Sequence, residues 1–308
     1  MPRRHERPRR PVGVGGEVTA QIIDAMRQGT SAWQMPWHCD QSALELPRSL
    51  SGRRYTGINV LALWSSARRY GFSQATWGTR EQWARQGCRV LPAETATTAV
   101  IYRQRDAQCA AEDRQRMLFA RRLPVFNRCQ VIGGAAATKA VARPLVVLAD
   151  LLRSTGAQVQ YGGTVACYRP DKDDILMPHH ARFRAGGDDT LPAYAAVLLH
   201  ELVHWTGAPS RLNRDLSTRF GAASYAIEEL VAELGSAYLC SALGISSTPR
   251  ADHARYISEW FDALRRDKRA IFLAASHAER AMQFLLGFCR RARATQKVRP
   301  LKEPKITA

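Results

Sequence analysis

In the second half of the chain, hydrophobic residues recur at intervals of three and four, the spacing of one face of an α-helix. The pattern predicts helices over residues 144–155, 191–207, 224–243, 251–266 and 271–290. Two apolar runs with strand-like patterning predict strands over 159–168 and 174–177. We therefore expect a mainly helical domain with a small sheet.

The first half mixes helical and strand periodicities. Helices are predicted over 17–29, 58–70 and 80–86, and strands over 97–102 and 123–131. We interpret the proline-containing segment 33–51 as a loop and the charged run 103–122 as an excursion between the two strands. The small-residue run GGAAAT at 133–138 predicts a domain junction. The expected fold class is α+β, with a mixed α/β domain over 13–135 and the mainly helical domain over 140–289.

Charge is distributed unevenly along the chain. The net charge is +18, and residues 11–140 hold 17 Lys/Arg against 9 Asp/Glu, whereas residues 141–289 hold 16 of each. Residues 1–12 and 290–308 are predicted to be basic tails, the first of them disordered. A basic front half suggests a polyanionic partner, although an arginine-rich host proteome would give the same bias. The charge sign excludes an acidic mimic of DNA.

The seven cysteines form no C-x-x-C pair, so neither a disulfide framework nor a cysteine zinc knuckle is indicated. The sequence contains no run of 18 apolar residues and no apolar segment after its basic start. We therefore expect a cytoplasmic protein of a bacterium with no membrane span and no secretory signal.

The decapeptide LLHELVHWTG at 198–207 contains the pattern H-E-x-x-H. On a helix, His200 and His204 are one turn apart and point the same way, so two imidazoles can bind one cation. Glu201 lies on the adjoining face, where a carboxylate can take a proton from a zinc-activated water. The motif predicts a Zn²⁺ site with Glu201 as the catalytic residue.

A hydrolytic zinc site needs a third protein ligand. The segment YAIEELVAELG at 225–235 places Glu229 and Glu233 on one face of a mostly apolar helix. We assign Glu229 as the ligand and Glu233 as the residue that orients a zinc histidine, most simply His200. Glu228 is the alternative ligand, and solvated glutamates without any metal role are the remaining interpretation.

Other polar residues could line the same cleft. His179, next to His180, follows a predicted strand and either lines the cleft or lies on a surface loop. His253 and Tyr256 could steady an oxyanion, the alternative being an ordinary place on a helix surface.

Five of the seven tryptophans fall within residues 33–83, interleaved with arginines. Single-stranded nucleic acid is bound by aromatic faces that stack on bases and by a basic groove that follows the phosphates. The composition suits that task, although part of these tryptophans, Trp64 among them, is expected in the core. No signature of a base-reading motif is present.

These residues carry a resemblance to a known family. The chain resembles the ArdC-type antirestriction proteins, which are also related to the N-terminal region of TraC-type plasmid primases. The front half matches through PW at 36–37, SGRRYTGIN at 51–59, WGTREQ at 77–82 and PVFNRCQ at 124–130. The back half matches through ACYRPDKDDILMP at 166–178, LLHELVHWTG, SRLNRD at 210–215, YAIEELVAELG and DHARYISEW at 252–260.

The resemblance implies a nonspecific single-stranded DNA-binding domain followed by a zincin-like, gluzincin-type metallopeptidase domain. It implies metal positions at His200, His204 and Glu229, and a catalytic glutamate at Glu201. Together with the composition, it places DNA-binding residues at Trp33, Trp37, Arg53, Arg54, Tyr55, Asn59, Trp77, Thr79, Arg80 and Gln82. The chain departs from the family pattern at Ser49 and in VLPAE at 90–94, where a lysine and a glycine are missing.

The leading hypothesis is a single-stranded DNA-binding protein with a zinc peptidase-like domain. It would act in antirestriction or in the establishment of incoming mobile-element DNA, with a protein or peptide as a possible further substrate. One alternative is a DNA-binding protein whose zinc site is structural or silent. The other is a plain intracellular zinc metalloprotease.

Overall fold

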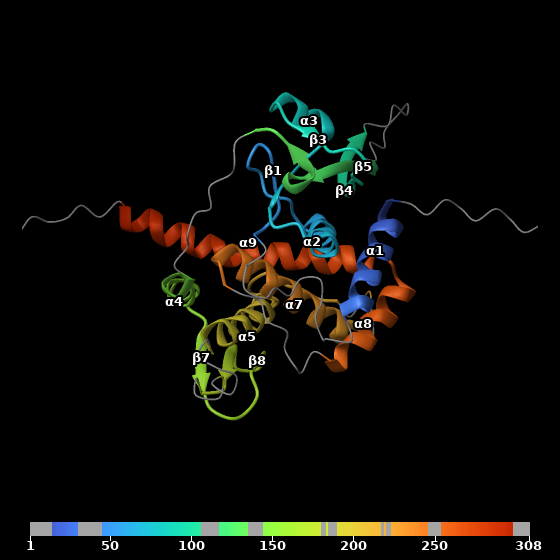
Figure 1. The fold of residues 1–308 in the computed structure, drawn as a ribbon. Helices are drawn as coiled ribbons and strands as arrows, with labels where there is room; N and C mark the ends of the chain where they lie inside the picture. The colour runs from blue at the N-terminus through green and yellow to red at the C-terminus, as the bar shows by residue number, and fades with distance from the viewer. Residues whose placement is uncertain are drawn as a thin grey trace, which may run out of the picture. The chain divides into compact units, whose positions relative to one another are not determined.

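The structure, a computed structural model (Figure 1), describes residues 14–29, 45–105, 117–134, 144–179, 183, 190–216, 219, 223–245 and 254–297. The chain divides into two compact units. The first holds the elements from α1 to β6 together with the returning segment Phe261–Phe272. The second holds the elements from α4 into α8, as far as Trp260, and α9 from Leu273 onward. None of the described helices has the length and hydropathy that a membrane span requires.

The first unit is built around a four-stranded sheet with the order β1-β2-β5-β4. Its strands are β1 (Arg48–Ser49), β2 (Thr76–Gly78), β4 (Thr97–Arg105) and β5 (Met117–Asn127). A smaller sheet pairs β3 (Arg89–Val90) with β6 (Val131–Ile132), which follows the short 3-10 helix η2 (Arg128–Gln130). The helices are α1 (Val14–Gly29), α2 (Ile58–Tyr70) and α3 (Arg80–Arg85). They confirm the mixed α/β character expected of the front half.

Helix α2 forms the centre of this unit, where it packs against β4 and α1. Its stretch from Val60 to Leu63 is at most 1% exposed, and Trp64 is 2% exposed. The helix ends at Gly71, whose positive φ of 67° favours glycine and lets its N–H reach the last carbonyls of the helix. Sequence periodicity predicted these bounds correctly because α2 has a strong apolar face and a glycine stop.

The long hairpin β4–β5 differs from the expectation. The charged run 103–122 was predicted to be an excursion, but β4 continues to Arg105 and β5 begins at Met117, in unbroken antiparallel register. Alternation of side chains across the ladder allows charged residues to occupy a strand as long as one face meets water. The charge of residues 103–105 and 117–122 therefore did not mark a loop, since these residues belong to the two strands.

The second unit packs a three-stranded sheet against the long helix α5 (Thr190–Trp205), which in turn packs against α7 (Ser224–Leu243) (Figure 1). The sheet has the order β7-β9-β8, formed by β7 (Gln158–Tyr161), β9 (Asp174–Met177) and the edge strand β8 (Cys167–Arg169). The remaining helices are α4 (Pro144–Thr155), α8 (Ala254–Arg266) and α9 (Ala270–Lys297). A mainly helical region with a small sheet was expected and is confirmed.

The single strand predicted over 159–168 is wrong. Gly163, with a positive φ of 67°, lies in the turn that separates β7 from β8. The two strands run in opposite directions beside β9, since β7 pairs with it in parallel and β8 antiparallel. An apolar run with two adjacent glycines thus encodes a reversal, and it brings β8 alongside α5.

Candidate metal centre

The two histidines of the H-E-x-x-H pattern project from the buried helix α5. Leu198, Leu199, Leu202 and Val203 around them are all fully buried, so the helix is held by apolar packing on several sides. The Nε2 atoms of His200 and His204 lie 3.1 Å apart. The helical spacing of four residues therefore brings both rings to one point, as the sequence predicts.

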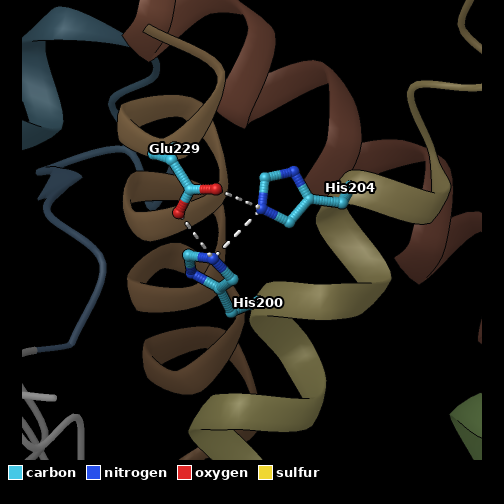
Figure 2. A group of neighbouring side chains, drawn as sticks. All are labelled: His200, His204 and Glu229. Atoms are coloured by element: carbon cyan, nitrogen blue, oxygen red, sulfur yellow. Dashed lines mark hydrogen bonds and ion pairs between the residues drawn. The ribbon is translucent and has the colours of Figure 1, made fainter. Parts of the chain in front are cut away.

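Helix α7 adds a carboxylate to this point, as Figure 2 shows. Glu229 places Oε2 3.5 Å from Nε2 of His200 and Oε1 3.5 Å from Nε2 of His204. In the described part of the chain, these three residues form a group whose ligand atoms all lie within 4.8 Å of one another.

The spacing of the three ligand atoms fits a divalent cation. Ligand atoms about 2.1 Å from one tetrahedral zinc ion lie about 3.4 Å from each other. The separations of 3.1 to 3.5 Å between the imidazole nitrogens and the carboxylate are close to that value. Two imidazoles and one carboxylate are also the donor types that zinc accepts in a hydrolytic site.

The charge state of Glu229 suits a ligand. Burial raises its pKa, but this effect is outweighed by a hydrogen bond with His200, by the charges of both histidines and by a hydrogen bond from Tyr225. The net result lowers the pKa of Glu229 to about 2. The carboxylate is therefore ionised at neutral pH, as metal binding requires.

Each histidine has a second carboxylate behind it. Oε2 of Glu233 lies 3.7 Å from Nδ1 of His200, which is the place expected for an orienting residue. Oε1 of Glu228 lies 3.2 Å from Nδ1 of His204. Glu228 also accepts a two-pronged set of hydrogen bonds from Arg214, at 2.7 and 2.5 Å. Its carboxylate is engaged on the far side of His204, away from the atoms that meet at Glu229.

Glu201 lies 4% exposed beside the edge strand β8. Its Oε2 accepts a hydrogen bond of 2.9 Å from the backbone N–H of Tyr168. The Tyr168 hydroxyl in turn donates to Asp173 at 2.8 Å and accepts a hydrogen bond of 3.1 Å from Arg211. The guanidinium of Arg211 also lies 3.9 Å from the ring centroid of Trp205, at the end of α5. This network fixes β8, and with it the N–H that binds Glu201.

Two of the three other predicted cleft residues lie in the described part of the chain. His179 is exposed just after β9. Tyr256 lies on α8, and His253 lies outside the described residues. Three residues at or behind the metal centre escaped the sequence analysis, namely Arg214, Tyr168 and Tyr225. Tyr225 could have been predicted, because it precedes Glu229 by four residues and so lies on the same face of the helix.

Four of the predicted DNA-binding residues have structural tasks. Trp77 is 1% exposed, which corrects the expectation that it stacks on a base. Both amide atoms of Asn59 bond to the backbone of Val100, at 2.8 and 2.7 Å. Thr79 and Gln82 form a reciprocal capping box at the start of α3. Burial and these contacts show that the four residues stabilise the fold of the first unit.

The other residues of that set differ in exposure. Arg53 and Arg80 are exposed, and the guanidinium of Arg80 lies 4.9 Å from the ring centroid of Phe126. Arg54 and Tyr55 are half-buried, and burial raises the pKa of Tyr55 to about 12. Trp33 and Trp37 lie outside the described residues. Among the described aromatic residues of this unit, Tyr70 and Tyr102 are the most exposed, at 51% and 55%.

The fold and the cluster of His200, His204 and Glu229 define a two-unit protein whose second unit is a zincin-like metallopeptidase domain, and residues 147–277 match that domain family. Residues 14–131 match the N-terminal domain of anti-restriction factor ArdC. The chain belongs to the ArdC-type antirestriction family.

Similar proteins agree with this placement. The crystal structure of the metal-free antirestriction ArdC protein from the R388 plasmid is 33% identical, with a TM-score of 0.75 over 90% of this chain and 98% of that one. Its Mn(II)-bound structure gives a TM-score of 0.72 at 33% identity, over 89% of this chain and 97% of that one. An uncharacterized protein of Sinorhizobium fredii, y4eC, is 42% identical over 90% of this chain and 93% of its own length. A DNA primase TraC of Escherichia coli is 33% identical over 88% of this chain, which spans only 27% of that primase.

Proposed function

We propose that the second unit binds one divalent cation, zinc in the first instance, through His200, His204 and Glu229. The observation that carries the proposal is the convergence of two imidazole nitrogens and one carboxylate within 3.1 to 3.5 Å. The fractional exposure of the His204 and Glu229 side chains, 14% and 10%, supports access to the centre from solvent. Mn(II) in the homologous ArdC supports a divalent ion.

We further propose that the centre performs hydrolysis of a peptide or protein. When bound, the cation supplies a Lewis acid that polarises a carbonyl and lowers the pKa of a water ligand. Glu201 takes the proton as general base and can return it to the leaving amine. The backbone N–H of Tyr168 holds the Glu201 carboxylate in place for this transfer. Tyr225, 59% exposed, donates a hydrogen bond to Glu229 and so helps to hold the proposed ligand carboxylate in place.

For the first unit we propose sequence-nonspecific binding of single-stranded DNA. The excess of 17 basic over 9 acidic residues across 11–140 and the match to the ArdC N-terminal domain support this function. Trp64, Trp77 and Trp83 are buried and cannot stack on bases. We therefore propose that exposed rings such as Tyr102 stack on the bases instead. Tyr102 pairs with Ala120, and Val100 with Arg122, so the tyrosine and the arginine project from the same face of the β4–β5 ladder.

The combined proposal is an antirestriction protein that acts on mobile-element DNA entering a bacterial cytoplasm as a single strand. The ArdC relatives support the antirestriction role, and the DNA primases TraC support a link to DNA. DNA binding and hydrolysis are separable parts of the proposal, because the residues named for them lie in different units.

One preparation tests both parts. Metal content is measured by mass spectrometry, and a labelled single strand and its matched duplex are titrated with the protein at two salt concentrations. We expect one zinc per chain and tighter binding of the single strand, with a salt dependence that grows by about 0.7 in log–log slope for each phosphate contact. If the protein binds zinc but shows no preference for the single strand, the DNA-binding part of the proposal is wrong and a plain metalloprotease remains.

Matched variants locate the DNA-binding surface. Tyr102→Ala together with Arg122→Ala should weaken single-strand binding and reduce the salt slope by about 0.7. Arg153→Ala, at a side chain that is 77% exposed in the second unit, serves as the control for removal of a surface charge. Equal losses in both variants would point to a diffuse charge effect and contradict a defined surface.

A further inference from the structure

Glu228 and Glu229 are adjacent on α7, yet they face different partners. The Glu229 carboxylate approaches the Nε2 atoms of both histidines, at 3.5 Å each. The Glu228 carboxylate approaches Nδ1 of His204, at 3.2 Å. Both residues therefore contact His204 from opposite edges of its ring, and the sequence alone left open which one binds the metal.

Arg214 fixes the side chain of Glu228. Its Nε donates to Oε2 at 2.7 Å and its Nη2 to Oε1 at 2.5 Å, a geometry in which both carboxylate oxygens are engaged. The side chains of Arg214 and Glu228 are only 1% and 24% exposed, so solvent weakens this pair little.

Arg214 is itself tied to α5, the helix that carries His204. Its Nη2 donates to the carbonyl of Val203 at 2.9 Å, and its Nη1 donates to Oγ1 of Thr206 at 3.2 Å. Gly207 permits this approach, because a Cβ atom there would lie 2.9 Å from Nη2. The guanidinium and the Glu228 carboxylate thus hold a fixed position relative to the His204 ring.

We propose that Glu228 positions His204 for metal binding and that Arg214 holds Glu228 to this task, so that Glu229 is left as the carboxylate ligand. The inference rests on the proposed metal site and specifies how that site chooses between two neighbouring glutamates. Glu228 and Arg214 are positioning residues, since neither belongs to the group of ligand atoms formed by His200, His204 and Glu229.

The chemical reason lies in the tautomer of His204. A neutral imidazole carries one N–H and one lone pair, and the proton favours the nitrogen with the closer carboxylate acceptor. For His204 that acceptor is Glu228, 3.2 Å from Nδ1, whereas Glu229 lies 3.5 Å from Nε2. A hydrogen bond from Nδ1–H to Glu228 therefore leaves the lone pair on Nε2, the atom that faces Glu229 and His200. In water, imidazole side chains favour the opposite tautomer, with the proton on Nε2. Loss of the acceptor should consequently turn the wrong nitrogen toward the metal.

The test reads this tautomer directly by ¹⁵N NMR of the metal-free full chain, with its histidine rings labelled. We expect His204 protonated on Nδ1 in the parent protein. Removal of Glu228 alone would leave Arg214 as a lone buried charge, which is strongly destabilising. The variant is therefore the apolar pair Glu228→Leu with Arg214→Met. In it we expect His204 to move to the Nε2–H form and zinc affinity to fall by about 10–100-fold.

Three comparisons make the result specific. His200, whose Nδ1 faces Glu233, is an internal reference and should keep its tautomer in the apolar pair. Glu228→Gln retains an acceptor oxygen but not the counter-charge of Arg214, so, measured where the variant is folded, it should preserve the His204 tautomer and lose less affinity. Glu259→Gln, at an exposed position on α8, should change neither.

Two results would overturn the proposal: an unchanged His204 tautomer in the apolar pair, or a changed tautomer with no fall in zinc affinity. Failure of the parent protein to bind zinc would instead contradict the proposed metal site. The NMR measurement still decides the positioning role in that case, because it uses metal-free protein.

Discussion

At the scale of single residues, Glu201 and Glu229 are buried carboxylates in different surroundings. Glu229 lies between two imidazoles, whereas Glu201 is held by the backbone N–H of Tyr168 on β8. A carboxylate among the ligand atoms serves the metal, and one held beside them can transfer a proton.

This difference predicts the outcome of Glu201→Gln. The amide has a similar size and can still accept the hydrogen bond from Tyr168, so metal content should stay at one ion per chain. Loss of the general base should reduce any metal-dependent peptide cleavage by about 10²–10⁴-fold. Metal content by mass spectrometry and cleavage of a peptide library measure the two effects.

Glu229→Gln is the matched control, and it should lower metal affinity instead. Loss of the metal in Glu201→Gln would show that Glu201 is a ligand, and the assignment of roles would be wrong.

Asn59 supports a second prediction at this scale. Strand β4 lies at the edge of its sheet, and Asn59 bonds to both the N–H and the C=O of Val100. Asn59→Ala leaves two backbone groups of a residue that is 2% exposed without this partner, which should lower the free energy of unfolding by about 2–3 kcal/mol. Urea unfolding followed by tryptophan fluorescence measures the loss.

The same variant separates folding from DNA contact. Under conditions where Asn59→Ala is fully folded, single-strand affinity should equal that of the parent chain. Gln86→Ala, at an exposed position after α3, is the stability control. Reduced affinity without reduced stability would restore Asn59 to the DNA-binding surface.

The residues of the site differ in how far sequence could predict them. His200, Glu201 and His204 follow from a local spacing, because one helix turn alone places the two imidazoles. Glu229 required only that a second apolar helix carry an inward carboxylate. Arg214 could not be predicted, since it lies 14 residues from Glu228 and meets it only after folding. Trp77 was predicted to bind DNA but is buried, because composition alone does not distinguish a buried ring from an exposed one.

At the scale of elements, the metal centre depends on how closely α5 and α7 approach. Gly235 of α7 allows that approach, because a Cβ atom there would lie 2.8 Å from Cγ2 of Val203 on α5. Ser236 reinforces the contact through a hydrogen bond of 2.8 Å to the carbonyl of Ala196.

Gly235→Ala sets two effects against each other. Alanine favours a helix by about 1 kcal/mol over glycine, but overpacking a core interface costs about 1–3 kcal/mol. Val203 is fully buried and its branched side chain has little freedom at χ1, so overpacking should prevail. We expect a net destabilisation of up to about 2 kcal/mol. Metal binding should also weaken, because the carboxylate of α7 is displaced from the imidazoles of α5. Chemical denaturation and zinc titration report both.

The double variant Gly235→Ala with Val203→Ala provides the control. It removes the methyl groups that the new Cβ would strike, so the combined loss of stability should be smaller than the sum of the single losses. A Gly235→Ala protein that is more stable than the parent would contradict the close approach.

Elements with one strong periodicity were predictable from sequence, and reversals were not. The bounds predicted for α2, α4 and α7 are those of the structure, since each has an apolar stripe. The strand over 159–168 was misread because its apolar run continues through the turn that contains Gly163.

At the scale of the whole molecule, the chain returns to complete its first unit. The segment Phe261–Phe272 groups with that unit although it follows most of the second one in sequence. Leu264, Ala270 and Ile271 of this segment are fully buried, and Thr19 of α1 donates a hydrogen bond of 2.9 Å to the carbonyl of Lys268. Sequence periodicity predicted helices there but offered no sign of which unit they complete.

The returning segment predicts that residues 1–135 alone form a weakened domain. Without Phe261–Phe272, the fragment exposes apolar surface and loses the partner of Thr19, so its urea midpoint should fall below that of the same unit in the full chain. The buried Trp64, Trp77 and Trp83 report its unfolding through fluorescence. A fragment in which a flexible linker joins residues 1–135 to residues 254–272 should recover most of the midpoint.

Amide exchange in the full chain provides a check without truncation, because the amides of α1 and of residues 263–271 should open together. If the fragment 1–135 unfolds at the midpoint of the full-length unit, the returning segment adds no stability, and the first unit is a self-sufficient domain whose single-strand binding can be studied in isolation.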